Sequence, residues 1–311
     1  MPYPIDKKLV VGVSSNALFD LEMEDKIFEE QGIKKYREYQ VENKHVILNK
    51  GVAFPFIKRF LNINSVYAKE QPVEVVLLSK NSPETGIRIF NSIKHYNLRI
   101  SRAAFLSGIS PYNYIPAYNI SLFLTTNQKD VNLSIGAGFP AGIFLKTKIE
   151  DLEEDLELRV AFDFDGVIAD DQAETVYQES NDLSKFHDFE TENILQPHNP
   201  GPLAEFFKKL GYFQKLESKK FDKDLNYKKI LRTSIVTARN APSHERAINT
   251  LKMWDVNVDD MFLMGGIEKS RVLSVLKPHL FLDDQLTHLD VKSNLPLVHI
   301  PFGLINNKIE L

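Results

Sequence analysis

The sequence LRVAFDFDGV, residues 158–167, joins a short apolar run to two aspartates, Asp163 and Asp165, and then to a glycine. An apolar run of this length, bounded by polar residues, is typical of a buried strand. Gly166 allows the chain to turn sharply directly after the two acids. The stretch therefore predicts a strand whose carboxyl end carries two carboxylates, the place where an open α/β sheet binds its ligands.

Similar apolar runs recur along the chain and alternate with helix-like segments. The expected strands are 9–13, 73–78, 121–124, 158–162, 232–236, 279–282 and 296–300. Helical periodicity between them is clearest at 241–253 and 268–276. This alternation predicts an α/β protein with parallel sheets that helices cover on both faces.

Length and composition narrow the class of protein. The 311 residues predict two domains at about 150 residues each. Forty-two acids against 38 bases give a net charge of −4, which disfavours a nucleic-acid partner. The absence of cysteine excludes disulfides and thiolate metal sites. No run reaches about 20 apolar residues and no secretory signal is visible, so we expect no membrane partner and a cytoplasmic location.

The chain resembles itself at nearly constant offsets. Residues that coincide are Val10 with Val160 and Asp20 with Asp170 (offset 150), Asn81 with Asn240 and Pro83 with Pro242 (159), and Gly108 with Gly266 (158). These offsets predict an internal duplication, with units at 1–149 and 158–311 joined by an acidic linker at 150–157. The extra residues of the second unit fall near the lysine-rich stretch 215–229, which we expect to be an exposed loop; a phosphate-attracting lip is the alternative.

Polar residues of the second unit stand where expected strands end. Thr237 and Asp283-Asp284 each end a strand, as Asp163 does, and Lys269 opens a helix. Because the carboxyl ends of parallel strands face one crevice, these side chains can converge. Carboxylates packed together repel unless a cation lies among them, and oxygen ligands suit Mg²⁺.

The same set of side chains suits phosphoryl transfer. One carboxylate can attack phosphorus to form an aspartyl-phosphate, and a second can protonate the leaving oxygen. The Thr237 hydroxyl and the Lys269 ammonium can hold the phosphoryl oxygens. Arg239 and Asn240, which follow Thr237, are candidates to reach the phosphate or the ribose.

DFDGV at 163–167, with Thr237, Lys269 and Asp283-Asp284, resembles the four motifs of the haloacid dehalogenase superfamily of phosphotransferases. The resemblance implies Rossmann-like three-layer α/β/α units with a small lid between the first and second motifs. It also implies roles for individual residues. Asp163 would be the nucleophile, Asp165 the general acid/base, Thr237 and Lys269 the phosphoryl ligands, and Mg²⁺ would be held by Asp163, Asp165 (through its carbonyl), Asp283 and Asp284.

Longer segments, among them SGISPYNYIPAYNISLFL and VTARNAPSHERAINTLKMW, resemble cytosolic 5′-nucleotidase type I proteins. This resemblance implies hydrolysis of nucleoside 5′-monophosphates, with AMP the usual family substrate, in a homo-oligomer. The first motif departs from those relatives, which read Asp-Gly-Asp-Ala-Val, yet both carboxylates remain. A phosphatase for another small phosphomonoester, such as a sugar phosphate, is one alternative, and a nucleotide-responsive binding protein is another.

The first unit keeps none of the chemical groups at the aligned positions, which are Val13, Ser15, Leu78, Pro111 and Thr125-Thr126. We therefore expect it to bind no Mg²⁺ and to form no phosphoenzyme. Its strand ends still carry polar loops, including Asn81 and Ser82. These loops are expected to bind substrate nucleotide or a nucleotide effector, or to form an interface; simple helix capping is the alternative.

Overall fold

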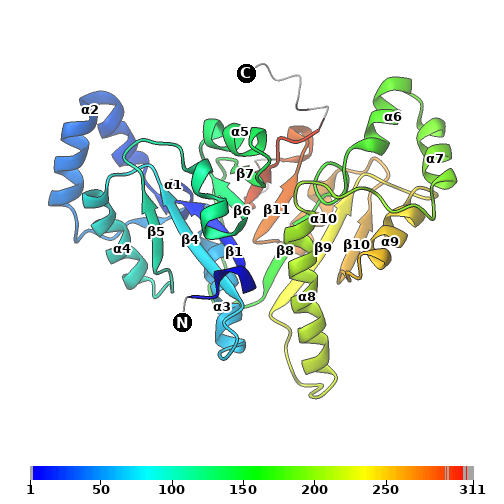
Figure 1. Ribbon diagram of the computed structural model, residues 1–311, viewed down its shortest axis with the longest axis horizontal. Helices are drawn as coiled ribbons and strands as arrows, with labels where there is room; N and C mark the ends of the chain where they lie inside the picture. The colour runs from blue at the N-terminus through cyan, green and yellow to red at the C-terminus, as the bar shows by residue number, and fades with distance from the viewer. Residues whose placement is uncertain (1–2, 291, 293, 304–305, 307–311) are drawn as a thin grey trace. The chain divides into compact units, whose positions relative to one another are not determined.

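The computed structural model describes residues 3–290, 292, 294–303 and 306, and the chain divides into two compact units between Lys146 and Thr147 (Figure 1). Among the described residues, each unit has five parallel strands, and helices flank these strands. The predicted α/β class with parallel sheets is confirmed. In the described part of the chain, no helix is both long enough and apolar enough to cross a membrane.

The first unit orders its strands β5-β4-β1-β6-β7. These strands are β1 (Leu9–Ser14), β4 (Val73–Ser79), β5 (Arg102–Phe105), β6 (Ile120–Thr125) and β7 (Ala141–Phe144). Its helices are α1 (Ser15–Leu18), α2 (Glu22–Glu42), α3 (Phe54–Val66), α4 (Gly86–His95) and α5 (Gln128–Gly136). A short antiparallel pair, β2 (Phe19–Asp20) and β3 (Asn49–Lys50), joins the two ends of the α2 segment.

The second unit orders its strands β10-β9-β8-β11-β12. These strands are β8 (Leu158–Phe162), β9 (Leu231–Thr237), β10 (Asp260–Leu263), β11 (Leu280–Asp283) and β12 (Leu297–His299). Its helices are α6 (Gln172–Ser180), α7 (Leu183–Glu192), α8 (Ala204–Phe221), α9 (His244–Met253) and α10 (Lys269–Leu276). We call residues 170–199, which contain α6 and α7, the lid; this is where the sequence predicted one.

Two sequence expectations need correction. The lysine-rich stretch 215–229 is not wholly a loop, because its first part forms the end of α8. Phe213 and Glu217 are buried on one side of that helix, whereas Lys219 is exposed and Lys215 and Lys220 are half-buried, so this segment is amphipathic. Strands β5, β7 and β10 were not predicted. Each has only four residues, and β5 and β10 are also largely half-buried, so none offers a long continuous apolar run.

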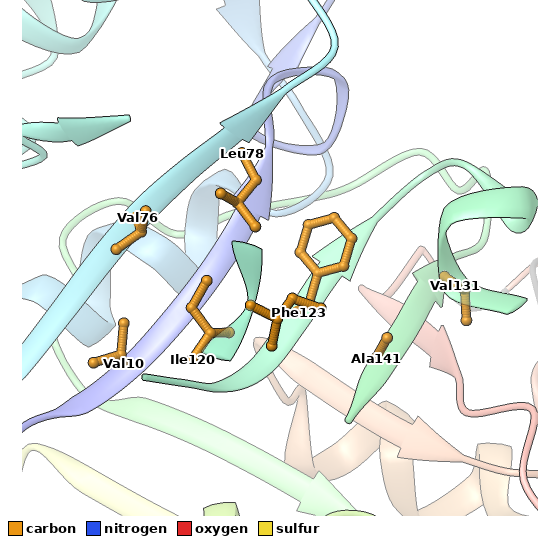
Figure 2. Close-up of a cluster of buried hydrophobic side chains, with 8 residues drawn as sticks. Val10, Val76, Leu78, Ile120, Phe123, Val131 and Ala141 are labelled. Carbon is orange, nitrogen blue, oxygen red and sulfur yellow. The ribbon is translucent and has the colours of Figure 1, made fainter. Parts of the chain in front are cut away.

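Apolar side chains from four strands and their connections form the core of the first unit (Figure 2). The cluster consists of Val10, Val76, Leu78, Ile115, Ile120, Phe123, Val131 and Ala141. Val76 and Leu78 are alternate residues of β4, as expected for a strand that presents side chains to both faces. Ile120 and Phe123 of β6 are three residues apart, because the register between β1 and β6 shifts after Ile120. The strand ends that carry the polar loops are thus held on a rigid, closely packed base.

The two units share internal bonding as well as strand order. In the first unit, Ser92 Oγ accepts a hydrogen bond from the Leu48 N–H at 3.0 Å, and in the second Thr250 Oγ1 accepts one from the His198 N–H, also at 3.0 Å. The Phe19–Lys50 pair likewise has its counterpart, 150 residues on, in the Ala169–Pro200 bridge. These matches are what a duplication predicts, and descent from one duplicated unit stays a prediction.

The strand pairings correct the predicted alignment by one residue at two positions. Leu9 donates to the Pro72 carbonyl as Leu158 donates to the Ile230 carbonyl, so the counterpart of Asp163 is Ser14 and not Val13. The Ser79 hydroxyl accepts from Asn81 N–H as the Thr237 hydroxyl accepts from Arg239 N–H. Ser79, not Leu78, is therefore the counterpart of Thr237. An alignment that rests on a few scattered identical residues cannot show a one-residue gap next to a strand.

Two equivalent glycines, Gly51 and Gly201, lie directly against backbone atoms. A Cβ on Gly201 would lie 2.3 Å from the Ala169 carbonyl oxygen, and one on Gly51 would lie 2.5 Å from that of Ala17. Because backbone cannot rotate away, Gly201→Ala is expected to lower the free energy of unfolding by about 2 kcal/mol. Gly136→Ala is the matched control, since no atom lies within 4 Å of its Cβ position. Urea unfolding measures both, and an unchanged midpoint for Gly201→Ala would contradict the expectation.

Candidate active site

Three of the predicted side chains meet at the carboxyl edge of the second sheet. Lys269 Nζ lies 2.7 Å from Asp163 Oδ2 and 2.7 Å from Asp283 Oδ2. Strands β8 and β11 are parallel neighbours, and Asp163 N–H donates to the Leu282 carbonyl, so the two aspartates leave the sheet side by side. All three side chains are buried. The predicted convergence of these residues across about 120 positions of sequence is thus present in the structure.

Burial and charge together set the protonation of this cluster. Burial raises the pKa of Asp163 to about 7 despite the opposing Lys269 ammonium. Burial alone would lower the pKa of Lys269, but the carboxylates of Asp163 and Asp283 outweigh it and raise that pKa. Burial would likewise raise the pKa of Asp283, yet Lys269 and His288 hold it below its usual value. Lys269 therefore stays charged and keeps at least one carboxylate ionised beside it.

Asp284 has the features of an unsatisfied ligand. It is buried, its Oδ1 has no hydrogen-bond partner, and burial with the neighbouring Asp163 and Asp283 raises its pKa to about 9. Gly166, at φ +70°, leaves the space that Asp284 occupies, because a Cβ there would lie 2.4 Å from Asp284 Oδ2. A hard cation would stabilise the ionised form of these oxygens. The donor set therefore fits a divalent cation.

A histidine not singled out in the sequence stands beside this cluster. His288 Nδ1 lies 3.2 Å from Asp283 Oδ1, and single atoms of Asp163, Asp283 and His288 come within 4.8 Å of one another. The Gln285 N–H also donates to Asp283 Oδ1, at 2.9 Å. His288 thus helps to fix the orientation of Asp283 from five residues further along the chain.

Thr237 is the last residue of β9, the strand next to β8, and it is 1% exposed. Its hydroxyl accepts a hydrogen bond from Arg239 N–H at 3.3 Å, which leaves the hydroxyl proton available to a ligand. Asn240 follows at the start of the next loop, where its side chain lies against Gly265. The second predicted group of site residues is therefore placed at the same edge of the sheet.

Asp165 does not point into the lysine cluster but pairs with Arg239. Arg239 Nε lies 2.7 Å from Asp165 Oδ2, and Nη2 lies 2.7 Å from Oδ1, a bidentate contact. Nη1 of the same guanidinium bonds Glu190 and the Ser243 carbonyl. The rings of Phe164 and Phe186 lie over it, with centroids 5.2 and 5.4 Å from its central carbon. Arg239, a candidate for phosphate or ribose, is here the partner of an expected catalytic acid.

Glu190 of the lid is the centre of a buried charge network that the sequence reading missed. It bonds Arg239 and Arg246, the latter at 2.9 Å, and His198 Nε2 lies 3.3 Å from Oε2. Burial would raise the pKa of Glu190, but His198 and Arg239 overcome it and hold the pKa at about 2. The repeat gave a signal for this pair. Gln40 and Arg88, which bond each other in the first unit, align at offsets 150 and 158 with Glu190 and Arg246, which bond each other in the second.

Buried carboxylates, a bridging lysine and a strand-end threonine at one edge of a parallel α/β sheet define a site suited to a phosphoryl group and a hard cation. The chain belongs to the 5′-nucleotidase family, whose model matches residues 1–307. It is 34% identical over 297 residues to cytosolic 5′-nucleotidase 1B of Homo sapiens, covering 93% of this chain and 48% of that protein. The chain thus spans about half the length of this curated relative. No solved structure matches it.

Proposed function

We propose that the chain hydrolyses nucleoside 5′-monophosphates, with AMP preferred, to a nucleoside and phosphate at the Asp163 site of the second unit. The observation that supports this most is the buried contact of Lys269 with Asp163 and Asp283 in a member of the 5′-nucleotidase family. A lysine held between two carboxylates orients one of them and can neutralise phosphoryl oxygens as they approach.

The proposed reaction has two steps. An Asp163 carboxylate oxygen attacks phosphorus, the bond from phosphorus to the 5′ oxygen breaks, and Asp165 gives its proton to that oxygen. Water then attacks the aspartyl-phosphate while Asp165 takes a proton from it, which releases phosphate and restores Asp163. Thr237 and Lys269 hold the phosphoryl oxygens throughout.

The Asp165–Arg239 pair adds a condition to this reaction. Both oxygens of Asp165 are bonded to Arg239, so at least one of these bonds must open before Asp165 can transfer a proton. Glu190 and the Ser243 carbonyl hold Arg239 from the other side. Arg239 therefore has partners that keep it in place when Asp165 turns toward the substrate.

Mg²⁺ is the cation we propose for the acidic cluster. The carboxylates of Asp163, Asp283 and Asp284, with the backbone carbonyl of Asp165, would hold it. When bound, the ion would neutralise phosphoryl charge as the bond to the leaving oxygen breaks. The oxygen-rich donor set and the unpartnered Asp284 Oδ1 support this choice.

Mg²⁺ at millimolar concentration is expected to raise the midpoint of thermal unfolding of the full chain, and Asp284→Asn should remove that rise. The reason is that the asparagine keeps the shape of Asp284 but has no carboxyl group that can ionise when the cation binds. Asp290→Asn, a change at an exposed acid six residues on, is the control and should keep the rise. An equal rise in Asp284→Asn and in the unchanged chain would contradict the assignment.

A phosphate-release panel tests the proposed function. Nucleoside monophosphates with each base, their deoxy forms and several sugar phosphates are compared with Mg²⁺ and with EDTA. Turnover of AMP that EDTA abolishes is the expected result. Preference for a sugar phosphate would establish the alternative phosphatase, and no turnover of any phosphomonoester would favour a nucleotide-responsive binding protein. The homo-oligomer and the cytoplasmic location stay predictions.

A further inference from the structure

The first unit contains a cavity of about 510 Å³, which lies within the usual range for small-molecule sites. It opens at the carboxyl ends of β1, β4 and β6, where Ser14, Asn81 and Thr125 line it. Residues of α2, including Phe28 and Tyr36, form its wall. The carboxyl ends of parallel strands are where open α/β sheets bind ligands, so the cavity has the position of a functional site.

At the strand ends of the first unit, hydroxyl side chains stand where the second unit has Asp163 and Asp283. Ser14 is the counterpart of Asp163, and the Thr125 hydroxyl accepts the Asn127 N–H as Asp283 accepts the Gln285 N–H. Among the described residues, the one cluster suited to a metal lies in the second unit. At the positions of Asp163 and Asp283 the first unit thus has hydroxyl groups, and it keeps a cavity beside them.

Three buried polar atoms of residues that line this cavity have no hydrogen-bond partner: Arg37 Nε, Asn81 Nδ2 and Ser82 Oγ. Ser82 is 6% exposed. The Tyr36 hydroxyl donates to Asn81 Oδ1 at 2.8 Å, so the acceptor of this amide is already engaged and its NH₂ donor is not. Leaving such groups unpaired costs about 1–3 kcal/mol each. All three atoms carry a donor hydrogen, so a ligand with hydroxyl or carbonyl oxygens would supply their missing acceptors.

The charges around the cavity do not favour an anion. Lys80 Nζ lies 2.8 Å from Asp130 Oδ1, and the lining residues Arg37 and Lys146 are also ion-paired with carboxylates. Asp25 lines the cavity as well, and burial raises its pKa. Asp25, Glu29 and Asp130 balance the charges of Arg37, Lys80 and Lys146 around the cavity, so a phosphate dianion would meet no net positive charge. An uncharged polar ligand needs no such charge.

The wall supplies an uncovered aromatic surface. Phe28 packs edge-on against Tyr36, with ring centroids 5.8 Å apart, yet Phe28 is 49% exposed. Ile33, also on α2, lines the cavity and is half exposed. A planar ring placed there would cover apolar surface that the protein leaves in water.

A hydroxyl- and amide-lined floor beside an aromatic wall is complementary to a flat base joined to a sugar. We propose that the cavity of the first unit binds an uncharged nucleoside, and that a nucleotide binds there more weakly because its phosphate is disfavoured. The proposal does not depend on catalysis in the second unit. It replaces the nucleotide effector expected from the sequence with a ligand that carries no phosphate.

Equilibrium dialysis of the full chain with radiolabelled adenosine, in EDTA, tests the proposal. Phe28→Ala and Ser82→Val are each expected to weaken adenosine binding about tenfold, a loss of about 1.4 kcal/mol. Met23→Ala, a change at an exposed residue of α2 that does not line the cavity, should leave binding unchanged. Inorganic phosphate should not compete, and unlabelled AMP should compete at least tenfold less well than adenosine.

Thermal unfolding of each variant checks that the fold is intact. Phe28→Ala is expected to keep the fold because the Phe28 side chain is half exposed. Adenosine binding that neither Phe28→Ala nor Ser82→Val weakens would place the ligand elsewhere and overturn the proposal. Tighter competition by AMP than by adenosine would also overturn it, in favour of a nucleotide site. Absence of adenosine binding at millimolar concentration would overturn it outright.

Discussion

Asp163→Asn is expected to lower the turnover of AMP by at least about 1000-fold, because the amide cannot serve as the nucleophile. Asp163 is buried, and one of its oxygens lies 2.7 Å from Lys269 Nζ. Asparagine keeps nearly the same shape, and Lys269 retains Asp283 as its charged partner. The free energy of unfolding should therefore change by less than about 1 kcal/mol, so the loss of turnover is chemical.

Steady-state phosphate release measures the loss of turnover, and urea unfolding measures the change in the free energy of unfolding. Asp255→Asn is the matched control, because it makes the same change at a highly exposed acid of the second unit. That control should keep full turnover. Retained turnover in Asp163→Asn would remove this residue from the reaction and with it the proposed aspartyl-phosphate.

Glu190→Ala is expected to lower the free energy of unfolding by about 3–5 kcal/mol, the largest effect on stability proposed for this chain. The carboxylate is fully buried and joins Arg239, Arg246 and His198. Removing it leaves two buried guanidinium groups short of a partner. Turnover should fall as well, because Arg239 loses a bond that holds it beside Asp165.

The contribution of Glu190 to the free energy of unfolding is expected to fall as the pH falls. The pKa of Glu190 is about 2 in the folded chain against an ordinary value of 4.5, so its contribution is complete above about pH 4.5. It is lost as the pH falls toward 2. The stability difference between the unchanged chain and Glu190→Gln should therefore be largest near neutral pH and shrink below about pH 4.

Urea unfolding at pH 7 and at pH 3.5 measures this difference. Glu192→Ala, at an exposed acid on the same lid helix, is the control and should lie within about 0.5 kcal/mol of the unchanged chain. A Glu190→Ala protein as stable as that control would show that the buried network contributes nothing.

The sequence allowed much of the fold to be predicted because buried parallel strands are short apolar runs and polar site residues follow them. Asp163 and Asp283 follow such runs directly, and Lys269 opens a helix, so their convergence could be inferred from strand order alone. Glu190 could not be found in that way. It lies inside a lid helix, and only tertiary packing brings it to Arg239.

The partner of Asp165 was missed for a related reason. Its position after β8 predicts a group near the strand end, but rotation about its side-chain bonds decides whether it faces Lys269 or Arg239. The register of the first unit was also wrong by one residue at Ser14 and Ser79. That correction turned apolar counterparts into hydroxyl groups and changed the expected chemistry of its cavity.

The antiparallel bridge between Ala169 and Pro200 brings the chain back beside the point where it left the sheet. Whatever lies between these two residues is therefore an insert with adjacent ends. Such an insert can change in length or sequence between relatives without shifting β8, as long as a residue in the place of Glu190 still bonds Arg239. Selection can then vary the rest of the lid, and a grafted lid that keeps Glu190 gives an experimenter the same freedom.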